Sequence, residues 1–287
     1  MRVLVVYAHN EKKSFNHALL DSAIRTLEEE GHNVTVSDLY EQEFDPVISR
    51  KDFTPEYEID RREHVNYALE YGKAWKEGRI DKKIVREQEK LDEADLVIFQ
   101  FPMFWMSMPA ILKGWFDRVF IENYAFGEGG KYYDTARFSG KKALISITTG
   151  GGRGWFTDHS PNGDINVILW PIQVGIIDNG ILRFVGFDVL AAQVHYAVET
   201  ATEKERQLIL SGWTKRLKRL SEEKPIEFVS LSQYEYEDAS KPIQGMRLKE
   251  KTLDQNADSG FGLTVGQHLG KPIPPNSLIY NNKVIES

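Results

Sequence analysis

Three runs of apolar residues constrain the fold of this 287-residue chain more than any other feature. They cover residues 2–8, 96–100 and 143–147, and nearly every position in them is apolar rather than every second one. A strand with this pattern is buried on both faces, which is typical of a parallel sheet with helices on each side. Because helical spacing occurs between the runs, the sequence predicts an α/β fold with a doubly wound parallel sheet.

The other elements follow from capping residues and apolar periodicity. Ser14 is placed to cap a helix with apolar residues three and four apart, and Gly31 is placed to end it. The pattern weakens from Pro225 onward, so we expect an α/β domain over residues 1–224 and a small irregular C-terminal domain over residues 225–287. We also expect helices at residues 84–91, 110–119 and 203–220, strands at residues 33–37 and 184–190, and a polar surface excursion with room for a short helix at residues 41–82.

Composition narrows the classes of partner and compartment. The net charge of −7 without a basic stripe argues against nucleic acid. The absence of cysteine excludes disulfides and thiolate metal sites, and the seven histidines lack the spacing of metal ligands. No run approaches the roughly 18 apolar residues of a membrane span, and the first run is too short for a signal peptide. We therefore expect a soluble, cytoplasmic protein with no metal and no membrane partner.

Three unusual loops follow three of the predicted strands, where a parallel sheet binds its ligand. Residues 8–16 lead polar side chains into a helix N-terminus, which suits an anion. Residues 101–109 gather aromatic and methionine side chains between two prolines, which suits a flat ligand or an apolar pocket. Residues 148–154 (TTGGGRG) offer hydroxyls and unobstructed backbone N–H groups, which suit the polar edge of a flavin ring. Taken singly, a capped polar loop, core burial and an ordinary glycine turn would explain them.

Longer blocks carry a resemblance to a known family. They are LVIFQFP at residues 96–102, PAILKGWFDRVF at 109–120, SITTGG at 146–151 and NVILWPIQ at 166–173. Shorter blocks occur at residues 48–52, 261–266 and 268–271. Together they resemble the NAD(P)H:quinone oxidoreductases of the DT-diaphorase type and the related ribosyldihydronicotinamide quinone reductases. The resemblance spans nearly the whole chain, and its C-terminal blocks distinguish the chain from shorter bacterial flavodoxin-like reductases.

The resemblance implies a flavodoxin-like fold, tightly held FAD and a homodimer with both active sites at the interface. It also implies a ping-pong reaction, in which NAD(P)H gives a hydride to the flavin and leaves before a quinone or similar flat acceptor takes it. The FAD-binding residues carried over are His9, Ser14, Phe15, Asn16, Ala18, Asn66, Pro102, Met103, Phe104, Trp105, Asp117, Thr148, Thr149, Gly150, Gly151 and Arg206, of which Asn66 and Asp117 would touch the partner's FAD. The substrate pocket carried over consists of Trp105, Met106, Phe126, Glu128, Tyr132 and Trp155.

The chain departs from the family at the catalytic positions. A tyrosine and a histidine beside the flavin are replaced by Phe156 and Asn162, which cannot relay a proton, although the amide can still donate a hydrogen bond. His159 is the remaining candidate for a proton donor. Phe126 and Glu128 replace two pocket tyrosines, and the segment at residues 175–180 is a few residues longer than its family counterpart.

We therefore interpret the chain as a FAD-dependent two-electron reductase of quinones, with alternatives left open. One is a flavin-binding or interaction protein with weakened catalysis. Another is a reductase of the same fold that acts on nitro or azo compounds. A third uses dihydronicotinamide riboside as its donor, since no arginine in the sequence is a convincing ligand for the 2′-phosphate of NADPH.

Overall fold

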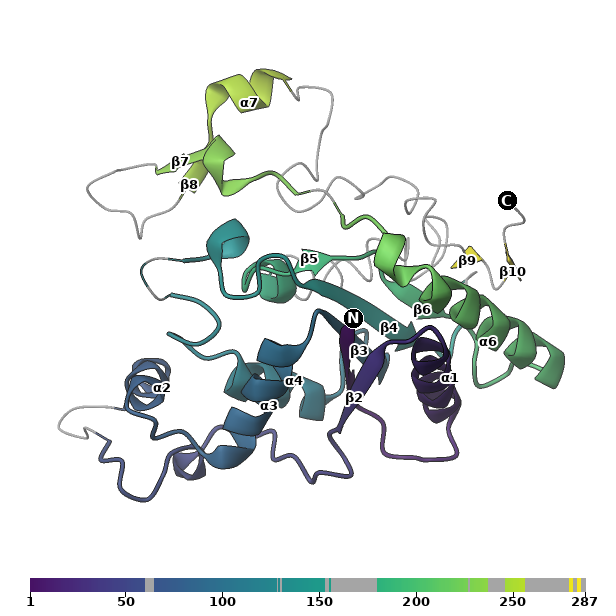
Figure 1. Cartoon of the computed structure of the whole chain (residues 1–287), viewed down its shortest axis with the longest axis horizontal. Coiled ribbons are helices and arrows are strands. Elements are labelled where there is room, and N and C mark those ends of the chain that lie inside the picture. Colours follow the sequence, from purple (N-terminus) through teal and green to yellow (C-terminus); the bar gives the residue numbers. More distant parts are fainter. Residues whose placement is uncertain are drawn as a thin grey trace.

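The computed structural model describes residues 1–59, 65–127, 129, 131–152, 155, 180–226, 228–236, 246–255, 279–280 and 283–284. Its centre is a parallel sheet with the strand order β2-β1-β3-β4-β5 (Figure 1). This order is the flavodoxin-like one, so the predicted α/β class is confirmed. The strands are β1 (Arg2–Tyr7), β2 (Asn33–Asp38), β3 (Leu96–Pro102), β4 (Lys142–Thr148) and β5 (Asp188–Val189).

Helices cover both faces of the sheet, as the apolar strands require. In β1, Val3 and Val5 belong to the core on the side of α1 (Phe15–Glu29) and α6 (Glu203–Lys218), which lie side by side in Figure 1. Leu4 and Val6 belong to the opposite core, together with residues of α2 (Tyr67–Lys76), α3 (Lys82–Glu93) and α4 (Ala110–Val119). Successive residues of one strand thus supply two cores, which is why almost none of its positions can be polar.

The predicted helix ends are largely confirmed. The Ser14 Oγ accepts a hydrogen bond from the His17 N–H at 3.2 Å and caps α1. Gly31 follows the helix with a φ of 78°, a left-handed conformation that glycine adopts at little cost. The helix predicted at residues 84–91 spans Lys82–Glu93, the one at 110–119 is α4, and the one at 203–220 ends at Lys218.

The strand predicted at residues 184–190 is wrong in extent. Residues 180–183 form a π-helical turn, and Gly186, with a φ of 103°, closes the chain reversal that follows. Only Asp188–Val189 then pair with the start of β4. A further strand, β6 (Gln193–His195), lies outside the predicted elements and pairs with the end of β4. Phenylalanine and valine have high strand propensity, but here the turn around Gly186 overrides it.

The segment predicted as a polar surface excursion is partly core. Tyr71 and Asp52 are buried, and the Tyr71 hydroxyl donates to the Asp52 carboxylate. The Arg118 guanidinium of α4 donates to the other Asp52 oxygen at 2.6 Å, and burial raises the pKa of Tyr71 far above its usual value. Breaking one partner would leave a buried charge uncompensated, so this contact holds residues 41–82 against α4.

The described parts of the chain after Pro225 contain short elements. The Ile226 N–H donates to the Val189 carbonyl at 2.7 Å and ties the beginning of this segment to β5. The proposed boundary between residues 224 and 225 stays a prediction. No helix among the described residues is both long enough and apolar enough to cross a membrane. The elements are a hairpin of β7 (Tyr234–Tyr236) and β8 (Met246–Leu248), α7 (Glu250–Gln255), and an antiparallel pair of β9 (Ile279–Tyr280) and β10 (Lys283–Val284).

Gly114 permits the close approach of residues 45–47 to α4. A Cβ at this position would lie 2.2 Å from the Pro46 carbonyl oxygen, so Gly114→Ala should lower the free energy of unfolding by about 1–3 kcal/mol. Gly72→Ala in α2 is the matched control, because its Cβ would meet the movable Asn123 amide end at 2.5 Å. Urea unfolding of both variants measures the difference. Equal losses would contradict the role of the Pro46 contact.

His195 should make the fold sensitive to acid. Its imidazole is buried, and burial together with the Arg216 charge lowers its pKa to about 3, well below the roughly 6.5 of an unfolded histidine. The unfolded chain therefore binds a proton first as the pH falls, and stability present above pH 6.5 is lost toward pH 3. Between pH 7 and pH 5, the wild type should lose about 2 kcal/mol more than His195→Gln in denaturant titrations.

His32→Gln is the control for this loss, because His32 is only half-buried and should carry less of the pH dependence. If His195→Gln and the wild type lose the same free energy over this range, another group titrates on unfolding.

Candidate functional site

The loops after β1, β3 and β4 meet at one edge of the sheet, as the sequence predicts. Ala8 donates its N–H to the Gln100 carbonyl at 3.0 Å, and Met103 donates to the Thr148 carbonyl at 2.8 Å. The loop after β4 continues this contact, because the Thr149 N–H donates to the His195 carbonyl at 2.9 Å. These backbone bonds bring the three loops together. We call them the edge loops: residues 8–18, 102–108 and 148–152.

A chain of buried side-chain hydrogen bonds links β3 to the first and third edge loops. The Gln100 amide donates to the Asn16 Oδ1 at 2.8 Å, and the Asn16 amide donates to the Thr148 Oγ1 at 2.6 Å. All three side chains are buried. Asn16 and Thr148 were both predicted to bind the cofactor. The structure shows that a hydrogen bond connects their side chains.

The N-terminus of α1 is suited to an anion. No described hydrogen bond uses the N–H groups of Phe15 and Asn16, which lie in the first helical turn, where the helix dipole is positive. Burial lowers the pKa of His9 below its usual value, and its Nδ1 accepts a hydrogen bond from the Glu11 N–H at 3.0 Å. The predicted residues Ser14 and Ala18 lie in the same turn.

Two buried nitrogen atoms near this helix end lack a hydrogen-bond partner among the described residues. They are the Nδ1 of His17 and the Nε of Arg206, whose guanidinium lies 5.8 Å from the centre of the Phe15 ring. A buried polar group left unpaired costs about 1–3 kcal/mol, so a bound molecule that satisfied these atoms would gain from both. This chemistry fits the phosphates and adenosine end of a dinucleotide cofactor.

The glycine loop after β4 leaves two backbone donors without a described hydrogen bond. The Gly151 carbonyl accepts from the Thr149 hydroxyl at 2.8 Å and from the Ala197 N–H at 3.1 Å, whereas no described bond uses the N–H groups of Gly150 and Gly151. Among the described residues, the Cβ that Gly150 lacks would have only the Glu199 carboxylate, 3.5 Å away, as a close neighbour. The loop can therefore approach the polar edge of a flat ring.

The loop after β3 ends in a strained and exposed turn. Phe104 and Ser107 exchange two backbone hydrogen bonds of 2.9 Å, and the residues between them, Trp105 and Met106, have φ angles of 50° and 57°. Large side chains adopt this left-handed conformation at a cost of order 1 kcal/mol each. The Trp105 side chain is 100% exposed. A turn that is both strained and apolar is typical of a surface that contacts a ligand or another chain.

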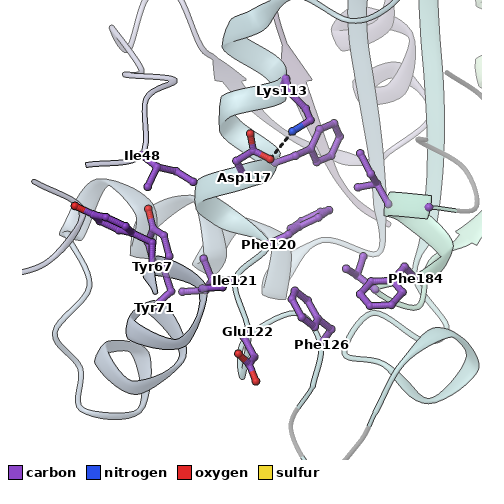
Figure 2. A pocket seen from close by; sticks show the side chains of 15 residues that line it. Ile48, Tyr67, Tyr71, Lys113, Asp117, Phe120, Ile121, Glu122, Phe126 and Phe184 are labelled. Carbon is purple, nitrogen blue, oxygen red and sulfur yellow. Dashed lines mark hydrogen bonds and ion pairs between the residues drawn. The ribbon is translucent and has the colours of Figure 1, made fainter. Parts of the chain in front are cut away.

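An aromatic cavity of about 570 Å³ lies apart from the edge loops, and none of their described residues lines it. Figure 2 shows its two ends. At one end, the Lys113 ammonium of α4 contacts the Asp117 carboxylate at 2.6 Å; at the other, Glu122 has no ion-pair partner among the described residues. Between them, rings that include Phe120, Phe126, Phe184 and Tyr67 line the wall.

The predicted residues thus fall into two groups. Asp117 and Phe126 line the aromatic cavity, and Tyr132 packs on Phe184 at 5.3 Å between ring centres. Asn66 caps α2 directly before the cavity residue Tyr67. The residues expected to face the partner's FAD therefore lie with the cavity rather than with the edge loops.

Some predicted residues lie outside the described part of the chain. They are Glu128, Phe156, His159 and Asn162, so the replaced catalytic pair and the proton donor stay predictions. Trp155 is described and is exposed. Its place in the substrate pocket also stays a prediction.

Several residues that the structure brings to the site were not predicted from the sequence. Gln100 carried a usable signal, since it is a polar residue in an otherwise apolar strand. His17 carried a weaker one, as a histidine in the first turn of the capped helix. Lys113 and Phe184 had none, because only the folded chain shows which face of α4 and which turn border the cavity.

Known proteins resemble this chain in fold and in sequence. A family model for the flavodoxin-like fold matches residues 1–217. The chain is 43% identical over 282 residues to NAD(P)H dehydrogenase [quinone] 1 of Cavia porcellus, covering 98% of each chain. It is 45% identical over 225 residues to ribosyldihydronicotinamide dehydrogenase [quinone] of Homo sapiens, covering 78% of this chain and 94% of that one.

One solved structure is also similar to this chain in both fold and sequence. The crystal structure of a putative quinone reductase from Klebsiella pneumoniae superimposes with a TM-score of 0.75 at 37% identity, over 84% of this chain and 92% of that one. Identity at this level over nearly the full length, together with the strand order and the edge loops, shows the family. The chain belongs to the flavodoxin-like family of NAD(P)H dehydrogenase [quinone] and ribosyldihydronicotinamide dehydrogenase [quinone].

Proposed function

We propose that the protein is a FAD-dependent two-electron reductase of quinones. The observation that carries the proposal is the meeting of three ligand-binding features at one sheet edge. They are the helix N-terminus and the glycine loop, whose N–H groups take part in no described hydrogen bond, and the exposed aromatic turn. Family membership supports the same conclusion. FAD bound there would accept a hydride from a reduced nicotinamide and pass it to a quinone, which is chemistry of the cofactor itself.

The edge loops would divide the work of holding FAD. The first turn of α1 would bind the phosphates, and the unpaired nitrogens of His17 and Arg206 would serve the adenosine half. Residues 102–105 would lie against the ring, and residues 148–151 would meet its polar edge. FAD rather than a mononucleotide is favoured by the family resemblance, and Arg206 of α6, whose guanidinium lies 5.8 Å from the centre of the Phe15 ring, adds a cation beside the turn that would bind phosphate.

The aromatic cavity would serve a flat acceptor in a homodimer. In this proposal the second copy covers the exposed Trp105 turn, and the cavity residues Asp117 and Phe126 reach the partner's flavin. The Lys113 charge is already neutralised by Asp117, whereas the Glu122 carboxylate is not paired among the described residues. The cavity should therefore favour uncharged flat rings over anionic ones. The lack of cysteine supports a cytoplasmic location.

A second candidate function follows from the catalytic positions. With Phe156 and Asn162 in place of a titratable pair, the chain would bind flavin but turn over slowly, as a weakened reductase or a flavin-dependent interaction protein. The remaining stabilisation would come from fixed dipoles, namely the Gly150 and Gly151 N–H groups and the Asn162 amide. The preferred donor, NADH, NADPH or dihydronicotinamide riboside, is part of the same question.

The function is tested on purified protein. We expect a yellow protein with about one FAD per chain, a dimeric mass, and reduction of an uncharged naphthoquinone with a higher kcat/KM than its sulfonated analogue. Glu122→Gln should narrow that difference, and FMN should bind more weakly than FAD. A colourless protein that FAD neither binds nor stabilises against heat would overturn the proposal. A monomer with full activity would overturn the dimer.

The replaced catalytic pair gives a separate expectation for rate. Phe156→Tyr combined with Asn162→His should speed flavin reduction by about a hundredfold, the lower end of what a positioned proton-transfer group contributes. Anaerobic stopped-flow reduction by each of the three donors measures the rate. His159→Ala is the matched control and should matter little. If the double variant is unchanged and His159→Ala abolishes reduction, His159 has taken over the proton transfer.

A further inference from the structure

Gln100 is an amide side chain at a position where burial favours an apolar residue. It lies in β3, whose seven residues are all buried, and its own side chain is 1% exposed. Burying an amide without a hydrogen bond costs several kcal/mol in apolar surroundings, so a partner is essential. The described partner of its side chain is Asn16, and nothing in the proposed binding of FAD uses Gln100 directly.

The bond to Asn16 has a direction. A side-chain amide offers an oxygen that only accepts and a nitrogen that only donates. Because the Gln100 nitrogen donates to the Asn16 oxygen at 2.8 Å, the Asn16 nitrogen is left to face Thr148, and it donates to the hydroxyl oxygen at 2.6 Å. The opposite polarity would require both amides to turn together.

The direction of these two amide hydrogen bonds also determines whether the Thr148 hydroxyl donates or accepts its next hydrogen bond. A hydroxyl has one hydrogen and two lone pairs, and here one lone pair accepts from Asn16. The hydroxyl hydrogen cannot point back at a donor, so it must point to another acceptor. No described hydrogen bond gives this hydrogen an acceptor, and the N–H groups of Gly150 and Gly151 on the same loop are donors.

We infer that Gln100 and Asn16 are positioning residues that hold the Thr148 hydroxyl as a hydrogen-bond donor toward the polar edge of the flavin. The inference rests on the proposed FAD site. It explains why the Thr148 hydroxyl would act as a hydrogen-bond donor, like the N–H groups of Gly150 and Gly151 on the same loop. A donor fixed in this direction, in line with the two N–H groups, favours the form of the ring that carries more negative charge. Its orientation is set in advance by two buried amides rather than by the ligand.

A double-mutant cycle on the FAD-loaded protein tests the coupling. The variants are Gln100→Leu, Thr148→Val and the pair, and the readouts are the FAD dissociation constant and the two-electron midpoint potential. Thr148→Val should favour oxidised over reduced FAD by about tenfold, and Gln100→Leu by about threefold. In the Thr148→Val background, Gln100→Leu should change neither readout, because no hydroxyl remains to be directed.

Two further variants separate positioning from loss of structure. Ser146→Ala removes a buried hydroxyl directly opposite Gln100 in the β3–β4 register, and it should leave the potential unchanged. Thr148→Ser keeps a hydroxyl and should restore the wild-type potential. Thermal unfolding of each variant, followed by a signal that does not come from the flavin, identifies any variant that fails to fold. If the Gln100 variant fails to fold, the comparison of Thr148→Ser with Thr148→Val still decides the direction of the hydroxyl.

The outcomes distinguish the two levels of the proposal. Additive effects of Gln100→Leu and Thr148→Val in proteins that bind FAD would overturn the inference alone. A potential that rises in Thr148→Val would show that the hydroxyl accepts rather than donates and would also overturn it. A wild-type protein that binds no FAD would overturn the proposed function, and this inference with it.

Discussion

The parallel pairing of β1, β3 and β4 is the constraint on which the site depends. Backbone hydrogen bonds align the carboxyl ends of these strands, so loops separated by about ninety and forty-five residues in the sequence end beside one another. The apolar cores on both faces hold that alignment, and the site adds only two buried amides and one hydroxyl to it. Binding residues on loops thus gain a rigid base, which is the usual advantage of placing a site at a sheet edge.

The sequence predicted those parts of the fold that depend on local patterns. The buried strands showed themselves as apolar runs, and α1 and α4 showed their ends through Ser14 and Pro109. The region around residues 184–190 was not predictable in the same way, because its apolar residues suit either a strand or a buried turn. There, the conformation of Gly186 decided the outcome.

The candidate site was predictable to a similar degree. The edge loops lie at strand ends, so the rule for parallel sheets placed them correctly. The cavity was harder, since it is formed by α4, by the residue after the Asn66 cap and by the turn around Phe184, and no sequence spacing connects these segments. The family resemblance supplied Asp117 and Phe126, whereas Lys113 and Phe120 became visible only in the folded chain.

The divided pairing along β4 has a consequence for how copies of this chain meet. β5 pairs with residues 142–143 and β6 with residues 146–148, and the chain leaves the ladder between them. A sheet border built from two such short pieces presents no continuous row of unpaired backbone groups to a neighbouring strand. In the folded chain, this border is therefore a poor template for edge-to-edge aggregation. At this border, contacts between copies would instead be made by side chains and loops.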